Sequence, residues 1–225
     1  MTDALAPHTR YVPAAGRAGL TGFYDPVLAL TMREATWRPR LIDELLSGDR
    51  FGGVNSVLDV GCGTGTLAVE LARRAPQASV TGVDGDRSVL DIAEVKAVNQ
   101  GVEVEFRSAM ATALPFAPGT FDRIACSLLL HHLVRRQKVA ALEECFRVLR
   151  PGGRLVIADW GAPADPVMRA AFLSLRALDG FEVTADHAAG RLPELIATAG
   201  FSVPRRRARW RTVWGTLELL VAERE

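Results

Sequence analysis

The stretch VLDVGCGTG, residues 57–65, decides the fold. An apolar run leads into three glycines spaced GxGxG, and an amphipathic segment follows from Thr66. Glycine has no Cβ, so its backbone can turn sharply and let a ligand approach closely. We therefore expect a strand, a ligand-binding loop and a helix; the alternative is a tight turn that binds nothing.

Outward from this loop, short apolar runs alternate with helix-length segments. We expect strands at residues 54–60, 79–83, 102–107, 121–127 and 154–159, and helices at residues 66–75, 88–99 and 135–149. Two further strand-like runs, residues 201–211 and 216–223, predict a terminal antiparallel hairpin. This order is typical of an α/β fold with a Rossmann-like, doubly wound, seven-stranded sheet, mostly parallel and covered by helices on both faces.

The segment before the first strand is expected to be helical. Asp25-Pro26 is typical of a helix N-cap followed by proline, and predicts a helix that runs to about residue 46. We expect residues 1–50 to form a helical cap over the ligand and residues 51–225 to form the main domain, together one globular unit.

Composition excludes several classes of partner. The 225 residues carry a net charge of +1, so no global field favours nucleic acid or a membrane surface. Three scattered cysteines predict reduced thiols and no metal site. No uncharged apolar run approaches the roughly 20 residues that span a bilayer, so we expect no transmembrane segment and a cytoplasmic address. A homodimer stays possible.

Two carboxylates flank the glycine loop. Asp84 closes the second predicted strand, where a carboxylate can accept hydrogen bonds from both ribose hydroxyls of an adenosine. The alternative role, capping the next helix, suits Asp86 better. Asp59 precedes the glycines, where it would either face an ammonium or sulfonium group or brace the loop backbone.

These residues resemble the class I S-adenosylmethionine-dependent methyltransferases. The run RYVPAAGRAGLTGFYDPVLALTMR, residues 10–33, is similar to the leader of the quinone-biosynthesis type. The similarity continues through further segments, in order and with matching spacing: VTGVD (80–84), ALPFAPGTFD (113–122), SLLLHHL (127–133), RVLRPGGRLVIAD (147–159) and AGF (199–201). The resemblance implies a seventh strand inserted antiparallel between the fifth and the sixth. It also implies methyl transfer from S-adenosylmethionine to a small molecule, with S-adenosylhomocysteine as the product.

The resemblance also assigns cofactor contacts. Gly61, Gly63 and Thr64 would surround the methionine part, Asp84 would hold the ribose, and Ser127 would lie beside the sulfonium. The implied set is completed by Asp59, Cys62, Gly85, Met110, Ala111, Tyr24 and Arg33.

Two of these assignments need comment. Met110 stands where the family usually has an aspartate that accepts from the adenine amino group; it can only pack on the adenine face, leaving the backbone of Ala111 to help. Arg33 could pair with the cofactor carboxylate, or be a surface arginine on an amphipathic helix.

Candidate catalytic residues lie at the exits of the fourth and fifth strands. His131 or His132 could remove a proton from an oxygen or carbon acceptor, or simply pack against the following helix. Asp159 and Trp160 would face the acceptor pocket, where an aromatic wall suits an aromatic, lipid-like or secondary-metabolite substrate; they could equally close the sheet.

A cationic strand is expected near the end of the chain. Arg205, Arg207, Arg209 and Arg211 alternate, which predicts that all four share one face. That face is a solvated sheet edge or a surface for an anionic lipid, acidic substrate or protein partner. Two rival functions remain: a nucleotide-dependent oxidoreductase, which the early third glycine disfavours, and a non-methylating protein that binds the same cofactor for cyclisation, decarboxylation or regulation.

Overall fold

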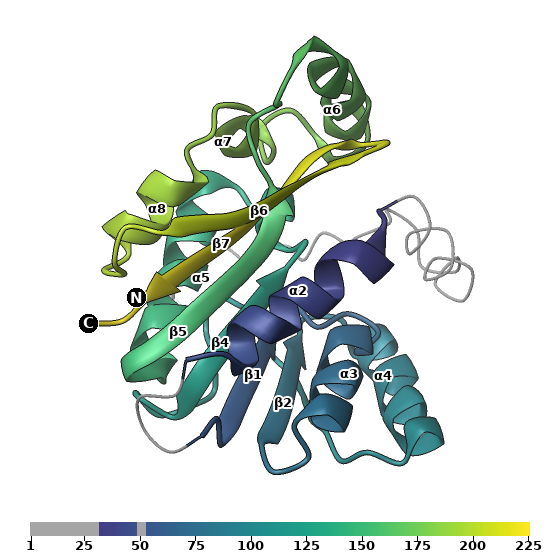
Figure 1. The fold of residues 1–225 in the computed structure, drawn as a ribbon, viewed down its shortest axis with the longest axis vertical. Coiled ribbons are helices and arrows are strands. Elements are labelled where there is room, and N and C mark those ends of the chain that lie inside the picture. Colours follow the sequence, from purple (N-terminus) through teal and green to yellow (C-terminus); the bar gives the residue numbers. More distant parts are fainter. Residues whose placement is uncertain (1–31, 49–52) are drawn as a thin grey trace, which may run out of the picture.

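A seven-stranded sheet forms the centre of the molecule (Figure 1). The structure is a computed structural model that describes residues 32–48 and 53–225. The strands lie in the order β3-β2-β1-β4-β5-β7-β6. They are β1 (Ser56–Val60), β2 (Ser79–Asp84), β3 (Glu105–Ser108), β4 (Phe121–Ser127), β5 (Leu149–Trp160), β6 (Arg205–Thr212) and β7 (Gly215–Glu223). The first five pair in parallel, whereas β7 lies antiparallel between β5 and β6, so the predicted sheet and hairpin are confirmed.

Helices cover both faces of this sheet, as predicted. The helices are α2 (Glu34–Leu46), α3 (Thr66–Arg74), α4 (Arg87–Gln100), η1 (Leu130–His132), α5 (Arg135–Val148), α6 (Pro166–Asp179), α7 (Ala185–Ala188) and α8 (Leu192–Thr198). Successive side chains of a strand point to opposite faces, so Leu155 joins a core cluster with α5 and α8, and Val156 joins a second with α2 and α3. The central strands are therefore buried on both sides.

Helix α2 is part of this core. Trp37, Leu41 and Ile42 are buried in the same cluster as residues of β5 and β7, and Figure 1 shows the helix lying across the sheet. It ends at Leu46 as predicted but begins only at Glu34, because Arg33 has a left-handed φ of 54°. The predicted start at Asp25 and the domain boundary near residue 50 lie outside the described residues.

Other elements also differ from prediction: β1 begins at Ser56 rather than residue 54, and β6 begins at Arg205 rather than residue 201. β3 begins at Glu105 rather than residue 102. β5 begins at Leu149 instead of residue 154, because the strand continues through Pro151 to Gly153 with a register shift against β4. The sequence patterns did not predict α6, α7 and α8 between β5 and β6.

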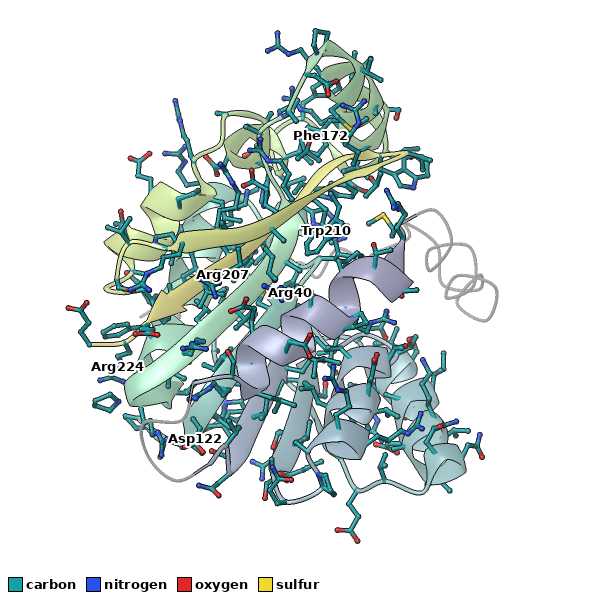
Figure 2. All side chains as sticks on the ribbon, viewed as in Figure 1. Arg40, Asp122, Phe172, Arg207, Trp210 and Arg224 are labelled. Carbon is teal, nitrogen blue, oxygen red and sulfur yellow. The ribbon has the colours of Figure 1, made fainter. Side chains whose placement is uncertain are left out.

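A β-bulge splits the arginines of β6. The register shifts between Arg206 and Ala208, leaving Arg207 as an extra residue. At the bulge, Nε of Arg207 donates to Glu44 on α2 at 3.1 Å, near Arg40 (Figure 2). After it, Nε of Arg209 donates to Glu218 on β7 at 2.9 Å. The prediction that the arginines share one face is therefore wrong, because one extra residue inverts the alternation.

Candidate active site

The glycine loop joins β1 to α3 and is tied to β2. The amides of Gly61 and Cys62 both donate to the carbonyl of Val83, at 2.8 and 3.0 Å. Gly61, Gly63 and Gly65 have φ values of 72°, 52° and 72°, which L-residues rarely adopt. A Cβ at Gly65 would lie 2.6 Å from Ala93, whereas a Cβ at Gly63 would meet no described atom within 4 Å. Gly65 thus serves packing, and Gly63 leaves open space for a ligand.

Asp84 is held at the end of β2 by backbone amides. Its Oδ2 accepts from Gly63 at 2.9 Å and its Oδ1 accepts from Asp86 at 3.0 Å. Asp86, not Asp84, caps α4, because its Oδ1 accepts from the amide of Ser88 at 2.8 Å. Burial raises the pKa of Asp84, and the amides of Asp86 and Gly63 offset part of that rise. Since a carboxylate has about four acceptor sites, Asp84 retains capacity for two ribose hydroxyls.

Asp59 is a buried carboxylate directly before the loop. The residue is 0% exposed, and neither oxygen accepts a hydrogen bond of normal geometry within the described part of the chain. Burial raises its pKa to about 7, the charge of Asp84 adds to the rise, and Arg38 offsets part of it. The backbone of Ala68 also lowers the pKa. Both roles expected of Asp59, a brace for the loop and a partner for an ammonium or sulfonium group, stay predictions.

The residues predicted to contact adenine lie beside the end of β2, and the residue predicted to contact the sulfonium ends β4. The amide of Ala109 donates to the carbonyl of Asp84 at 3.0 Å. This bond brings the half-buried Met110 and Ala111 close to Asp84, the residue predicted to hold the ribose. Ser127 ends β4, one position beyond the Cys126–Val60 pair that aligns β4 with β1. Ser127 therefore lies level with the start of the glycine loop.

Other predicted cofactor residues have different surroundings. The hydroxyl of Thr64 accepts from Lys96 of α4 at 3.1 Å, and the buried sulfur of Cys62 lies against Gly82 of β2. Arg33 donates to the carbonyl of Arg211 on β6, at the far edge of the sheet, at 3.3 Å. The structure therefore does not bring Arg33 to the glycine loop, and its cofactor contact stays a prediction.

Tyr24 lies outside the described residues. Gly85 separates Asp84 from Asp86, and its amide also favours the ionised Asp84.

Sequence reasoning missed three residues that support the loop. Leu129 covers Gly61, where a Cβ would come within 2.8 Å of its side chain, and Phe106 similarly fills the space over Gly82. Lys96 donates to Thr66 at 2.6 Å as well as to Thr64. For Leu129 and Phe106 the sequence signal was the presence of glycines that exclude a side chain. The contacts of Lys96 had no sequence signal.

Asp159, near the end of β5, contacts the residues that follow β4. It is 1% exposed, its Oδ2 accepts from the amide of Leu130 at 2.8 Å, and its Oδ1 lies 2.8 Å from Nδ1 of His131. Burial raises its pKa, but the charges of His131 and His187 and the hydrogen bonds from His131 and the amide of Trp160 outweigh burial, so the pKa is lowered overall. The prediction that Asp159 faces the acceptor is therefore corrected: all of it is covered, and it acts through His131.

Trp160 is also a core residue rather than a pocket wall. It is 0% exposed, and its ring centroid lies 5.9 Å from that of Phe172 on α6. Of the two roles predicted for Trp160, the structure supports packing that closes this end of the sheet.

The histidines at this exit are not equivalent. Burial lowers the pKa of His132 to about 3, with the neighbouring His131 adding to the effect, so His132 is a weak base. Asp159 orients His131 through Nδ1 and leaves Nε2 for other partners. Two residues that were not predicted as site residues join this cluster: His187 lies 3.6 Å from Asp159, and Asp179 of α6 lies 3.7 Å from Nε2 of His131.

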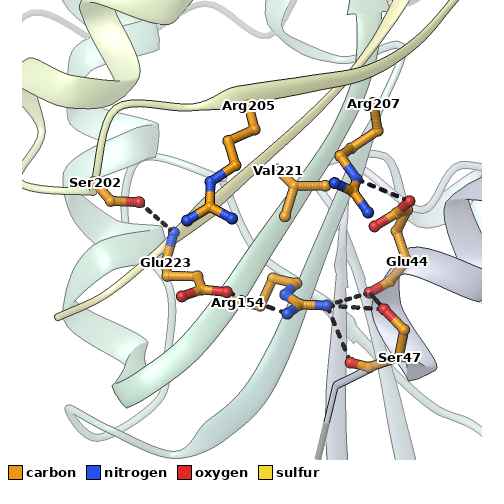
Figure 3. A pocket seen from close by; sticks show the side chains of 8 residues that line it. All are labelled: Glu44, Ser47, Arg154, Ser202, Arg205, Arg207, Val221 and Glu223. Carbon is orange, nitrogen blue, oxygen red and sulfur yellow. Dashed lines mark hydrogen bonds and ion pairs between the residues drawn. The ribbon is translucent and has the colours of Figure 1, made fainter.

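A polar pocket lies away from these groups, between α2 and the sheet edge (Figure 3). It is lined by Glu44, Ser47, Arg154, Ser202, Arg205, Arg207, Val221 and Glu223. Its charges largely pair with one another: Arg154 donates to Ser47 and Glu223, and Arg207 to Glu44. None of the predicted site residues lines it.

The residues around the loop fit S-adenosylmethionine. The unpartnered carboxylate of Asp59 would meet a positively charged group, Asp84 would accept from the ribose, and the space at Gly63 would admit a ligand against the backbone. Bare phosphate does not suit this arrangement, because both side chains that converge on the loop are acidic.

Comparisons with known proteins agree with this geometry. The sequence signature of the family described as "Methyltransferase domain" matches residues 57–153. The chain is 36% identical over 185 residues to a demethylmenaquinone methyltransferase of Thermus thermophilus, covering 74% of this chain and 81% of that protein. It is 34% identical over 151 residues to a ubiquinone/menaquinone biosynthesis C-methyltransferase of Desulfotalea psychrophila, covering 66% of this chain and 58% of that protein.

Solved structures share the fold. A SAM-dependent methyltransferase from Aquifex aeolicus superposes with a TM-score of 0.65 at 18% identity, covering 91% of this chain and 98% of that one. No helix among residues 32–48 and 53–225 is long and apolar enough to cross a bilayer. The site geometry and the Thermus relative together assign the chain to the class I S-adenosylmethionine-dependent methyltransferases.

Proposed function

We propose that this methyltransferase acts on a hydroxylated, ring-bearing small molecule of the quinone-precursor class and places the methyl group on a ring carbon. The observation that carries the proposal is the 36% identity to the demethylmenaquinone methyltransferase, which extends over 81% of that protein. The second relative is named as a C-methyltransferase, which supports carbon rather than oxygen as the acceptor atom.

The acceptor chemistry assigns a role to the His131–Asp159 pair. S-adenosylmethionine supplies an electrophilic methyl group on a sulfonium. A ring carbon beside a hydroxyl becomes nucleophilic when the hydroxyl loses its proton, and the carbon sheds its own proton after the new bond forms. Nε2 of His131 is the nitrogen left to take the first proton, because Asp159 engages Nδ1. Catalysis otherwise depends on alignment and on exclusion of water.

A product assay tests this proposal. The protein is incubated with methyl-labelled S-adenosylmethionine and a reduced, short-chain demethylmenaquinone, and the product is located by mass spectrometry and NMR. We expect one label on a ring carbon. A label on oxygen would overturn the assignment of the acceptor atom, and the absence of label from quinone precursors would overturn the substrate class.

Oligomeric state and cellular address remain predictions. A homodimer would show in light scattering as twice the mass of the 225-residue chain, and cell fractionation would test the cytoplasmic address.

A further inference from the structure

Three side chains that carry metal-ligand atoms meet between η1 and the end of α6. His131 and His132 are consecutive on η1, and Asp179 is the last residue of α6. One ligand atom from each lies within 4.8 Å of the others. The two elements are 47 residues apart in sequence between His132 and Asp179, so only the fold brings these groups together.

The orientation of His131 suits a metal ligand. Its Nδ1 lies 2.8 Å from Asp159, whose carboxylate is itself fixed by the amides of Leu130 and Trp160. A carboxylate on the far nitrogen is the usual outer partner of a metal-bound histidine, because it fixes the tautomer and the ring orientation. Nε2 is consequently presented to Asp179.

The separation of His131 and Asp179 is also informative. Nε2 lies 3.7 Å from Oδ2 of Asp179, which is too long for a hydrogen bond. Two ligands each about 2.1 Å from one tetrahedral ion lie ~3.4 Å apart, so small side-chain movements would seat an ion between them. His131 is buried, with 5% of its side chain exposed, whereas Asp179 is partly buried, with 17% exposed.

The surrounding charge favours a cation. Asp159 and Asp179 bring two carboxylates beside His131, and His187 lies 3.6 Å from Asp159. The nearby buried ammonium of Lys138 is engaged by Asp186 at 3.4 Å. A buried carboxylate is costly unless it is paired or coordinates a metal. An ion bound at Asp179 would provide that compensation.

We propose that Nε2 of His131, a ring nitrogen of His132 and the carboxylate of Asp179 bind one divalent transition-metal ion of the Zn²⁺ or Mn²⁺ class. Two histidines and one carboxylate form a recognised ligand set for such ions. Three protein ligands leave a coordination position open for water or an oxygen-bearing ligand. Cysteine spacing predicted no metal site, and nothing in the sequence connects Asp179 with η1.

The open coordination position of the ion would bind the methyl acceptor, a role that rests on the proposed function. The hydroxyl oxygen of the acceptor would bind the ion, which lowers the pKa of a bound hydroxyl. With Nε2 of His131 bound to the ion, the hydroxyl proton would pass to water. His131 would then act as a ligand held in place by Asp159, in place of the base proposed for the metal-free site.

Metal titration of the untagged full-length chain tests the site without any acceptor. After chelator treatment, Co²⁺ is added while visible absorption is recorded, and Zn²⁺ and Mg²⁺ are added as competitors. We expect one Co²⁺ per chain, displacement by Zn²⁺ and little displacement by Mg²⁺. Asp179→Asn and His132→Ala should each weaken Co²⁺ binding at least tenfold.

Asp165→Asn is the matched control, because Asp165 caps the other end of the same helix and asparagine preserves a cap. It should bind Co²⁺ like the wild type. Stoichiometric binding that is unchanged in both ligand variants, or no binding in the wild type, would overturn the site. S-adenosylmethionine affinity measured on the same samples shows that each variant is folded, and methyl transfer is assayed separately, so failure of the metal site and failure of the proposed function are distinguishable.

Discussion

Asp59 is subject to two opposing requirements. In the free protein its carboxylate is fully buried, without a hydrogen bond of normal geometry to any described residue, and its pKa is raised to about 7. In the cofactor complex its negative charge would face a positive group. The same residue therefore destabilises the empty site and stabilises the occupied one.

We predict that cofactor affinity depends on pH through Asp59. Below pH 7 most of the free protein carries a protonated Asp59, and binding of a cation must expel that proton. Affinity for S-adenosylmethionine should therefore rise by up to about tenfold per pH unit from pH 5.5 to 7 and then level off. Calorimetry at pH 5.5, 6.5 and 7.5 measures this, with Asp59→Asn as a control whose affinity should be lower and flat; a flat wild-type profile would refute the role.

We also predict that Asp59→Asn stabilises the free protein at pH 8. The folded pKa of about 7 lies above the unfolded value of 3.8, so the stabilising contribution is complete below pH 3.8 and is lost as pH rises through 7. Removing the charge at pH 8 should increase the free energy of unfolding by about 1–3 kcal/mol, less than the ~4 kcal/mol that three pKa units represent, because the amide stays poorly hydrogen-bonded. Urea denaturation at pH 8 and pH 5 checks this; an equal effect at both would contradict it.

At the scale of elements, the glycine loop shows what the sequence pattern could and could not predict. The strand–loop–helix order and the positions of Asp59 and Asp84 followed from residue type and spacing alone. Which glycines are required for packing could not be predicted from the sequence, because that depends on contacts with Ala93, Phe106 and Leu129 on other elements. The bulge in β6 was missed for the same reason: arginine alternation carries no signal that Arg207 is an extra residue.

Substitutions in the loop separate these tasks. Gly65→Ala should lower the free energy of unfolding by about 2–4 kcal/mol, since its Cβ would lie 2.6 Å from Ala93 at a φ of 72°. Gly63→Ala has open space in the free protein and should cost only about 1–2 kcal/mol of stability, while weakening S-adenosylmethionine binding at least tenfold. Thermal melts and calorimetry of both variants check this. Equal losses of stability with unchanged cofactor affinity would show that Gly63 does not border the ligand.

At the scale of the whole molecule, the sheet topology could be predicted from the sequence, whereas the arrangement of side chains around His131 and Asp159 could not. The parallel sheet with helices on both faces followed from alternating strand and helix patterns and from the restricted hands of crossover connections. The strand order and the position of β7 were supplied by family resemblance. The grouping of His131 with Asp179 and His187 depends on α6 and α7, for which the sequence patterns gave no prediction. Long-range packing also explains why Asp159 and Trp160, expected at the acceptor, are covered.

The central claim is that the loop between Asp59 and Asp84 holds S-adenosylmethionine. Calorimetric titration of the wild type and of Asp84→Ala with S-adenosylmethionine, S-adenosylhomocysteine and NAD tests it most directly. The structure predicts one site for each of the two adenosyl ligands, no saturable binding of NAD, and at least tenfold weaker binding of both ligands by Asp84→Ala. Saturable NAD binding without a response to either adenosyl ligand would contradict the claim.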